Sequence, residues 1–162
     1  MKKLILVRHA KSSWKYDVID HERPLNGRGR EDVELVSSYL ASSFGNTDLV
    51  LVSDAFRSRS TADVFIKNLK INQDIVHLNH DLYDFYGSDL IRTIKECNDT
   101  ITELMVFGHN HAITSFVNSH GDKYIENVPT CGVVIIEFSI DKWKNLNKGK
   151  TLKTVFPKDI KK

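Results

Sequence analysis

The stretch Leu4-Ile5-Leu6-Val7-Arg8-His9 begins with four apolar residues in a row and ends in two polar residues that can do chemistry. A short, continuously apolar run is typical of a strand buried on both faces, as in a parallel sheet covered by helices. Similar runs return at residues 49–52 (Leu-Val-Leu-Val) and 104–107 (Leu-Met-Val-Phe). Together these three runs predict the centre of a parallel sheet.

Helical periodicity fills the chain between the predicted strands. Apolar residues recur every three or four positions in residues 28–43, 55–69, 88–97 and 110–119, a spacing that predicts amphipathic helices. Ser88 is the expected N-cap of the third helix. Strands alternating with helices of this length predict an α/β fold, a three-layer α/β/α sandwich with a mainly parallel central sheet.

Three further segments complete the expected sheet. Residues 74–78 form a weaker strand pattern and residues 133–138 a stronger one. Residues 151–156 follow the latter closely, with no helical pattern between them. One of these last two strands is therefore predicted to be an antiparallel edge strand.

Length and composition indicate one domain, residues 1–162, of an ordinary globular kind. Hydrophobic residues make up 41% and charged residues 27%, and the net charge of +2 is too small to favour nucleic acid as a partner. The apolar runs are too short for a membrane span or a signal peptide. We therefore expect a cytoplasmic protein, in which Cys97 and Cys131 are free thiols.

Polar residues follow three of the predicted parallel strands. Arg8 and His9 follow the first, Arg57 lies shortly after the second, and His109 follows the run 104–107. Because the carboxyl ends of parallel strands meet at one edge of a sheet, these side chains are expected to lie together. Arginine forks bind phosphate oxygens, while a neutral histidine can act as a nucleophile and a cationic one can stabilise negative charge.

The same residues carry a resemblance to a known family. The run Leu6-Val7-Arg8-His9-Ala10 resembles the "RHG" signature of the histidine phosphatase (phosphoglycerate-mutase-like) superfamily, and residues 7–14 resemble its short, SixA-like phosphohistidine phosphatase branch. Further matches keep the family's order along the chain: residues 23–29 (RPLNGRG), 53–62, 82–84 (LYD) and 106–110 (VFGHN). Each motif alone is weakly specific, but the ordered set is highly specific.

The resemblance implies a catalytic role for four residues. His9 would be the nucleophile that accepts the phosphoryl group. Arg8 and Arg57 would bind the phosphoryl oxygens, and His109 would stabilise their charge in the transition state. Positioning and electrostatics of this kind are what phosphoryl transfer mainly requires.

Three other positions are expected to contribute to the site. Asp84 falls where the resemblance places a general acid, although members of the short branch do not all keep one there. Ser12 and Asn26 lie on loops that can add polar contacts to the substrate. Since a phosphorylated imidazole leaves more easily than an alkoxide, a missing acid would favour a phosphohistidine substrate.

The sequence also departs from the family pattern. Ala10 replaces the usual glycine, and Ser60 stands where Gln or Glu is common. Asp54 stands where proline is common and places a carboxylate near the expected anion pocket. It either orients an arginine, acts as an acid or faces solvent.

Other kinds of site are less well supported. The pairs His109-x-His111 and His77-x-x-His80 have histidines at short spacing, but no cysteine or carboxylate completes a metal-ligand pattern around them. We therefore expect an enzyme without metal or cofactor, a phosphatase that forms a phosphohistidine intermediate on His9. Its expected partner is a phosphorylated protein or a small phosphorylated molecule, with no nucleic acid, no membrane and an undetermined oligomeric state. Two alternatives stay open: a phosphatase of small metabolites, and a phosphate- or phosphoprotein-binding module with negligible turnover.

Overall fold

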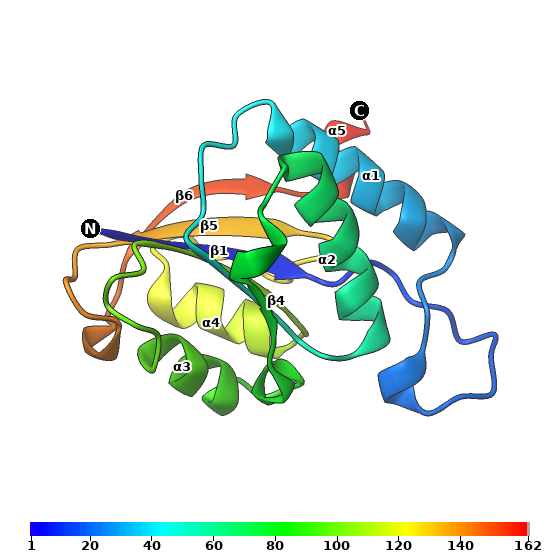
Figure 1. Cartoon of the computed structure of the whole chain (residues 1–162), viewed down its shortest axis with the longest axis horizontal. Helices are drawn as coiled ribbons and strands as arrows, with labels where there is room; N and C mark the ends of the chain where they lie inside the picture. Colours follow the sequence, from blue (N-terminus) through cyan, green and yellow to red (C-terminus); the bar gives the residue numbers. More distant parts are fainter. Residues whose placement is uncertain (162) are drawn as a thin grey trace.

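A six-stranded sheet with helices on both faces forms the body of the molecule (Figure 1). The computed structural model describes residues 1–161, so the last residue of the predicted domain, Lys162, lies outside the described part. The strands are β1 (Lys2–Arg8), β2 (Leu49–Val52), β3 (Val76–Leu78), β4 (Glu103–Gly108), β5 (Val133–Phe138) and β6 (Lys150–Val155). The helices are α1 (Gly27–Ala41), α2 (Phe56–Leu69), α3 (Ser88–Lys95), α4 (Ala112–His120) and α5 (Pro157–Ile160). Short 3-10 turns are η1 (Asp20–Glu22), η2 (Gln73–Ile75), η3 (His80–Leu82) and η4 (Trp143–Asn145).

The strands lie in the order β3-β2-β4-β1-β5-β6. The first four of these are parallel, whereas β5 pairs antiparallel with both β1 and β6. The mainly parallel sheet of the α/β sandwich is as predicted. The reversed strand β5, however, lies one place inside the edge, because β6 follows it closely in the chain and pairs along its outer side.

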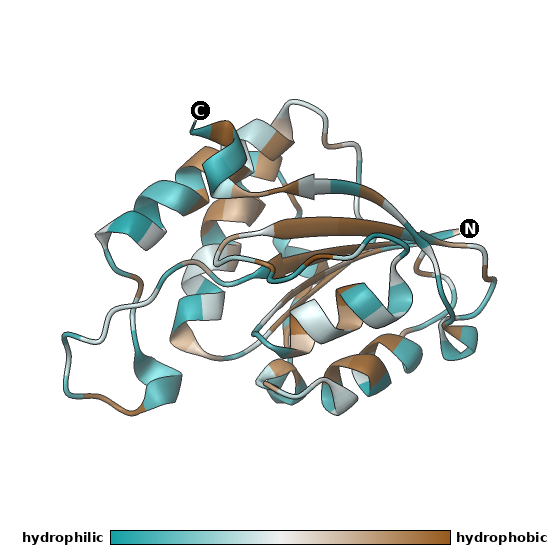
Figure 2. Cartoon of the chain, turned by 180° about the vertical axis from the view of Figure 1, so that it is seen from behind, coloured by the Kyte–Doolittle hydropathy of each residue, from teal (hydrophilic) through white to brown (hydrophobic). Residues whose placement is uncertain are grey.

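Each face of the sheet has its own apolar core. Leu4 and Leu6 of β1 pack on the side of α3 and α4, while Ile5 and Val7 pack on the side of α1 and α2. All four are nearly or wholly buried. Figure 2 shows the same pattern, with hydrophobic residues along the central strands and polar residues on the outer sides of the helices. The continuous apolar run that marked β1 thus reflects burial on both faces.

Local signals set where the helices begin. The Asn26 side chain caps α1 by accepting a hydrogen bond from the Gly29 amide at 2.8 Å. The N-cap of α3 is Gly87, with a φ of 120° that favours glycine, and not Ser88 as the sequence predicted. Within the described residues 1–161, no helix has the length and hydropathy needed to cross a membrane.

Gly29 allows the start of α1 to lie directly against the segment that follows β1. A Cβ atom at this position would lie 2.1 Å from the Lys11 carbonyl oxygen. That same oxygen accepts a hydrogen bond from the Asn26 amide at 3.0 Å. The loop after β1 is therefore held by close backbone contact with α1.

Candidate active site

The ends of β1, β2 and β4 bring the expected residues together. Arg8 pairs in register with Gly108, so His9 and His109 follow neighbouring strands at the same edge. Their ring centroids are 5.1 Å apart. Arg57 lies in the first turn of α2, the helix that follows β2. Residues separated by up to a hundred positions thus form one cluster.

The His9 ring is held by the backbone of the next residue. Its Nδ1 lies 2.7 Å from the Ala10 carbonyl oxygen, which can only accept, so Nδ1 carries the proton and Nε2 keeps a lone pair. The Ala10 amide in turn donates to Thr61 Oγ1 at 2.9 Å. Burial, together with the nearby arginines, lowers the pKa of His9 to about 3, so the ring is neutral at physiological pH.

Behind His9 the chain turns through Cys131. The Cys131 amide lies 3.0 Å from the carbonyl oxygens of both Arg8 and His9, and the residue has a φ of 62°. Its thiol is fully buried, and burial raises its pKa, so it is a packing group and not a nucleophile. Cys97 is likewise free, as predicted.

Two guanidinium groups lie in the site. Arg8 Nη1 donates to the Val128 carbonyl oxygen at 2.8 Å, and burial lowers the pKa of Arg8. Arg57 is 2% exposed and donates from Nη1 and Nη2 to the backbone oxygen and the carboxylate of Asp20, at 2.7 Å and 2.9 Å. Both guanidinium groups are therefore held in place by the fold itself.

His109 is 1% exposed, and two serines contact one side of its ring. Its Nε2 lies 2.8 Å from Ser53 Oγ and 3.3 Å from Ser58 Oγ. Burial, with added repulsion from the neighbouring His9 and Arg57, lowers the pKa of His109 to about 2. A cationic second histidine was expected from the sequence, but this environment favours the neutral form of His109.

Three buried nitrogens in this cluster have no hydrogen-bond partner. They are Arg8 Nε, Arg57 Nε and His109 Nδ1, and within residues 1–161 no other buried side-chain nitrogen lacks one. Since unpaired buried donors are costly and rare, their concentration in one place needs an explanation. Nitrogens without a partner in the protein are available to a bound anion.

Asp20, on η1, contacts the site from outside. Its carboxylate contacts Arg57 Nη2 at 2.9 Å and Arg23 Nε at 3.1 Å, and also accepts from the Tyr83 hydroxyl. Burial alone would raise the pKa of Asp20, but the hydrogen bonds from Tyr83 and Arg57 outweigh it and hold the pKa well below its usual range. An ionised carboxylate therefore occupies the outer edge of Arg57, where a phosphoryl oxygen would compete with it.

The two loop residues expected to bind substrate have structural partners. Asn26 is committed to capping α1. Ser12 Oγ accepts from Arg23 Nη1 at 2.7 Å, and the Arg23 guanidinium stacks on the Trp14 ring with its Cζ 3.5 Å from the ring centroid. The structure thus places Arg23 between Ser12 and Asp20, a cation for which the sequence argument gave no role.

Asp84 does not have the environment of a general acid. Its Oδ1 accepts from the Tyr86 amide at 3.0 Å, and its Oδ2 accepts from the amides of Gly87, Asp89 and Leu90 at 3.0–3.1 Å. Burial raises the pKa of Asp84, but these four backbone hydrogen bonds outweigh it and lower the pKa. These hydrogen bonds make Asp84 the anchor of α3 and favour its ionised form, and its role as a general acid stays a prediction.

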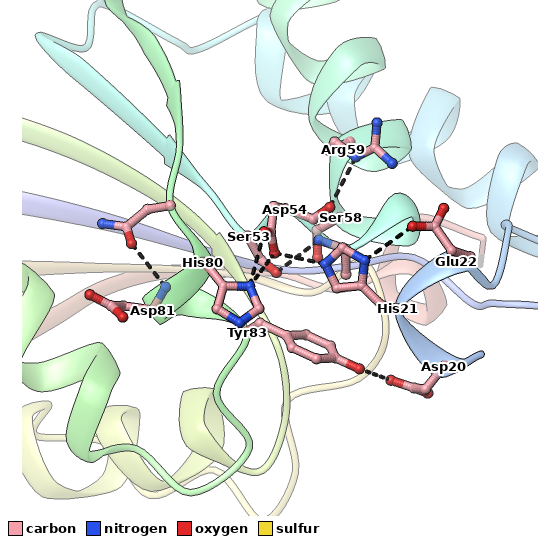
Figure 3. Close-up of polar contacts among 12 residues, drawn as sticks. Asp20, His21, Glu22, Ser53, Asp54, Ser58, Arg59, His80, Asp81 and Tyr83 are labelled. Carbon is pink, nitrogen blue, oxygen red and sulfur yellow. Dashed lines mark hydrogen bonds and ion pairs between the residues drawn. The ribbon is translucent and has the colours of Figure 1, made fainter.

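Asp54 joins two histidines at the rim of the site (Figure 3). His21 Nε2 lies 2.8 Å from Asp54 Oδ1, and His80 Nδ1 lies 2.9 Å from Asp54 Oδ2. The Tyr83 ring packs edge-on against both His21 and His109, at 4.9 Å and 5.3 Å between centroids. The three possibilities for Asp54 given by the sequence were orienting an arginine, acting as an acid and facing solvent. None of them includes this contact with two histidines.

Sequence reasoning did not single out several contributors to the site. Ser58, Asp20 and His21 act through contacts between segments far apart in the chain, which no local pattern reveals. Ser53 and Ser58 lay inside the quoted motif 53–62 without a role of their own, and by sequence alone Tyr83 fits either an aromatic rim of the site or ordinary packing. For Ser53 the available signal was its position directly after a predicted strand, and for Tyr83 it was its position just before Asp84.

Comparisons with known proteins place the chain near one family. The family model for the histidine phosphatase superfamily (branch 1) matches residues 4–82, a span that contains Arg8, His9 and Arg57. The chain is 26% identical over 153 residues to an uncharacterized protein of Mycobacterium tuberculosis, covering 88% of this chain and 93% of that protein. It is 28% identical over 156 residues to an uncharacterized chloroplastic protein of Arabidopsis thaliana, covering 88% and 69%.

Solved structures share the fold. The protein histidine phosphatase SixA complexed with tungstate superposes with a TM-score of 0.78 at 16% identity, covering 98% of this chain and 99% of that one. A mycobacterial glucosyl-3-phosphoglycerate phosphatase gives a TM-score of 0.65 at 8% identity, covering 97% and 99%. The ordered motifs, the family match over residues 4–82 and this shared fold make the chain similar to the histidine phosphatase superfamily.

Proposed function

We propose that this protein is a histidine phosphatase, which hydrolyses phosphohistidine or phosphomonoester groups through a covalent phosphohistidine on His9, without a metal. One observation carries the proposal. A neutral imidazole with its lone pair on Nε2 lies in a cluster with the unpaired donor nitrogens of Arg8, Arg57 and His109. Such an arrangement offers a nucleophile and an oxyanion site together.

In the first half of the reaction, His9 Nε2 attacks phosphorus in line with the leaving group. A P–N bond forms as the bond from phosphorus to the leaving group breaks. The two arginines hold the equatorial oxygens, and His109 donates to one of them from Nδ1. This role requires the Ser53 hydroxyl, 2.8 Å from His109 Nε2, to donate to that nitrogen, so that the proton of the neutral ring lies on Nδ1.

In the second half, a water molecule attacks phosphorus and the P–Nε2 bond breaks. Inorganic phosphate is released and His9 regains its free lone pair. The Nδ1–H bond to the Ala10 carbonyl holds the ring in one orientation through both halves. The same donors serve both transition states because the charge on the oxygens develops in the same place.

The leaving group favours an activated phosphoryl donor. Asp84 is ionised and fully hydrogen-bonded, so no carboxylic acid assigned by sequence protonates an alkoxide. The imidazole of a phosphohistidine leaves as a neutral ring when its other nitrogen carries a proton, so no acid is needed at the departing nitrogen. We therefore propose phosphohistidine as the preferred substrate class, which is also the substrate named for the SixA structure that shares this fold.

Small phosphorylated metabolites remain the second candidate. The fold is shared with a glucosyl-3-phosphoglycerate phosphatase, so it accommodates such substrates in a relative. A panel of phosphohistidine peptides and sugar phosphates, compared by kcat/KM, separates the two classes. A binding module without turnover would not need the tautomer control seen at His9.

We also propose that the protein works in the cytoplasm on a phosphorylated protein or small molecule, with neither nucleic acid nor membrane as partner. Two free cysteines and a nearly balanced charge support this setting. Fractionation of cells that express a tagged copy would test the location.

Replacing the nucleophile tests the proposed chemistry. His9→Ala should lower turnover of p-nitrophenyl phosphate by at least about 10³-fold, since no other group in the site offers a free nitrogen lone pair. Acid-labile phosphate should be trapped on the wild-type protein and not on this variant. His77→Ala, at an exposed position on β3, is the matched control. Turnover that survives in His9→Ala would exclude His9 as the nucleophile.

A further inference from the structure

Two histidines and one aspartate from three separate segments converge beside the active site (Figure 3). His21 belongs to η1, Asp54 precedes α2, and His80 begins η3. One ligand atom from each residue lies within 4.8 Å of the other two. No motif connects these positions, because 33 and 26 residues separate them along the chain.

The donor set matches a borderline divalent transition metal. Two imidazole nitrogens and one carboxylate oxygen are the ligands of many zinc sites that keep an open coordination position. At the usual Zn–N and Zn–O bond lengths, tetrahedral ligands lie about 3.4 Å apart, so shifts of about 1.5 Å or less would close the set around an ion. The His80 side chain is 72% exposed, which gives the ion a path from solvent and room for water as a fourth ligand.

Surrounding groups already orient these ligands. Glu22 Oε1 lies 3.2 Å from His21 Nδ1, the nitrogen on the far side of the ring from Asp54. Ligating histidines characteristically donate this second N–H to a carboxylate, which fixes the ring and strengthens the ligand. Arg59 Nε donates to the Asp54 carbonyl oxygen at 3.0 Å and holds the start of α2. The cluster thus has an outer shell as well as three ligands.

A hydrogen-bonded trio is the alternative reading of the same geometry. In that reading His21 would have to donate from both ring nitrogens, to Asp54 and to Glu22, while His80 donates to the same Asp54 carboxylate. A divalent ion removes that demand, because Nε2 then gives its lone pair to the ion and only Nδ1 donates. The Glu22 contact therefore fits a metal ligand without requiring a cationic ring.

We propose that His21 Nε2, His80 Nδ1 and the Asp54 carboxylate form a binding site for Zn²⁺ or a similar transition-metal ion at the rim of the active site. The ion ties η1 and η3 to the start of α2. Asp20, which contacts Arg57, directly precedes the ligand His21, so the site also fixes the segment that faces the anion pocket. The catalytic steps at His9 do not involve the ion.

Calorimetric titration with ZnCl₂ in phosphate-free buffer, after treatment with chelator, tests the site. The wild-type protein should bind one equivalent and should melt at a higher temperature as zinc is added, because the ion binds the folded state. His80→Ala and Asp54→Asn should each lose more affinity than the ~10–100-fold typical of removing an outer partner, and Glu22→Gln should fall in that range. Mg²⁺, which prefers oxygen ligands, should give no heat of binding.

Two matched variants locate the ion. His77→Ala removes an exposed histidine of the next strand, and His9→Ala removes the catalytic ring; both should bind zinc as the wild type does. Melting curves without metal should show that His80→Ala is folded, since that side chain is largely in solvent. A wild-type protein that takes up no zinc, or a His80→Ala variant that binds it like the wild type, overturns the proposal. Loss of binding in His77→Ala or His9→Ala would place the ion elsewhere and overturn it equally.

Discussion

The molecule uses histidine in two neighbouring regions with opposite environments. The inner pair, His9 and His109, is buried, and burial lowers both pKa values far below 6.5. The outer pair, His21 and His80, shares the carboxylate of Asp54, and that hydrogen bond raises the pKa of His21. The same side chain is thus neutral inside and a partner of negative charge outside, which shows that solvent access and neighbours decide its protonation.

The largest expected difference between the regions is in turnover. His109→Asn should lower kcat by about 10²–10³-fold, the usual cost of removing one donor to a developing oxyanion. His80→Asn in the outer pair should cost less than about tenfold. Steady-state kinetics with p-nitrophenyl phosphate measure both. Equal losses of kcat in the two variants would mean that the inner and outer histidines do not differ in their importance for turnover.

The inner and outer histidines should affect the free energy of unfolding in opposite directions as the pH falls. Between pH 6.5 and 5 the unfolded chain binds protons at His9 and His109 that the folded chain refuses, so stability falls as pH falls. Each residue contributes up to about 2 kcal/mol over this interval. The raised pKa of His21 acts in the opposite direction, because its contribution is present at low pH and is lost as pH rises.

Urea unfolding at the two pH values, for the wild type and for His109→Asn, measures the inner contribution. The variant should show a shallower loss of stability than the wild type. His77→Asn, in which an exposed ring is removed, should follow the wild-type curve. Parallel curves for all three proteins would show that the inner rings are not kept neutral by the fold.

The carboxylate of Asp84 can be tested in the same way, for stability and for turnover. Asp84 faces only backbone amides, so Asp84→Asn should destabilise the protein by about 1–3 kcal/mol through unpaired buried N–H groups. It should slow good and poor leaving groups in equal proportion, as measured with p-nitrophenyl and phenyl phosphate. A selective loss with phenyl phosphate would restore Asp84 as an acid.

The smallest effect is expected at Asp20, which competes with substrate for Arg57. Asp20→Asn should tighten inhibition by vanadate by a factor of up to about 5, in line with the weak net energy of a partly exposed ion pair. Asp17→Asn, a neighbouring exposed carboxylate, is the control for overall charge. Weaker inhibition in Asp20→Asn would mean that Asp20 positions Arg57 more than it competes with the anion.

Most of the fold could be predicted because its signals are local. The apolar runs of β1, β2 and β4 mark strands buried on both faces, and the helices follow the predicted ranges within a few residues. The place of β5 inside the edge could not be read, since strand order depends on pairing between distant segments. The helix α5 was not anticipated, as four residues carry too little periodicity.

The candidate site divides in the same way. Arg8, His9 and His109 follow strands, so the topology of parallel sheets predicted their meeting. The role of Asp84 stays a prediction, because sequence places a carboxylate near a site without showing which hydrogen bonds it accepts. The His21–Asp54–His80 cluster was out of reach, because its members come from three loops and only His80 belonged to a pair with suggestive spacing. Side-chain contacts between loops are what a single sequence conceals.

The position of the segment after β1, which carries His9, depends on Gly29, although Gly29 does not contact His9. Its missing side chain lets α1 rest on the Lys11 carbonyl, two residues beyond the nucleophile. Even a methyl group there would have to move α1 and the Lys11 backbone apart by about an ångström, since a Cβ lies 2.1 Å from the Lys11 oxygen and contacts under 3.0 Å essentially never occur, and it would shift the turn that carries His9. A substitution at the start of α1 would therefore change the orientation of the His9 ring without contacting it.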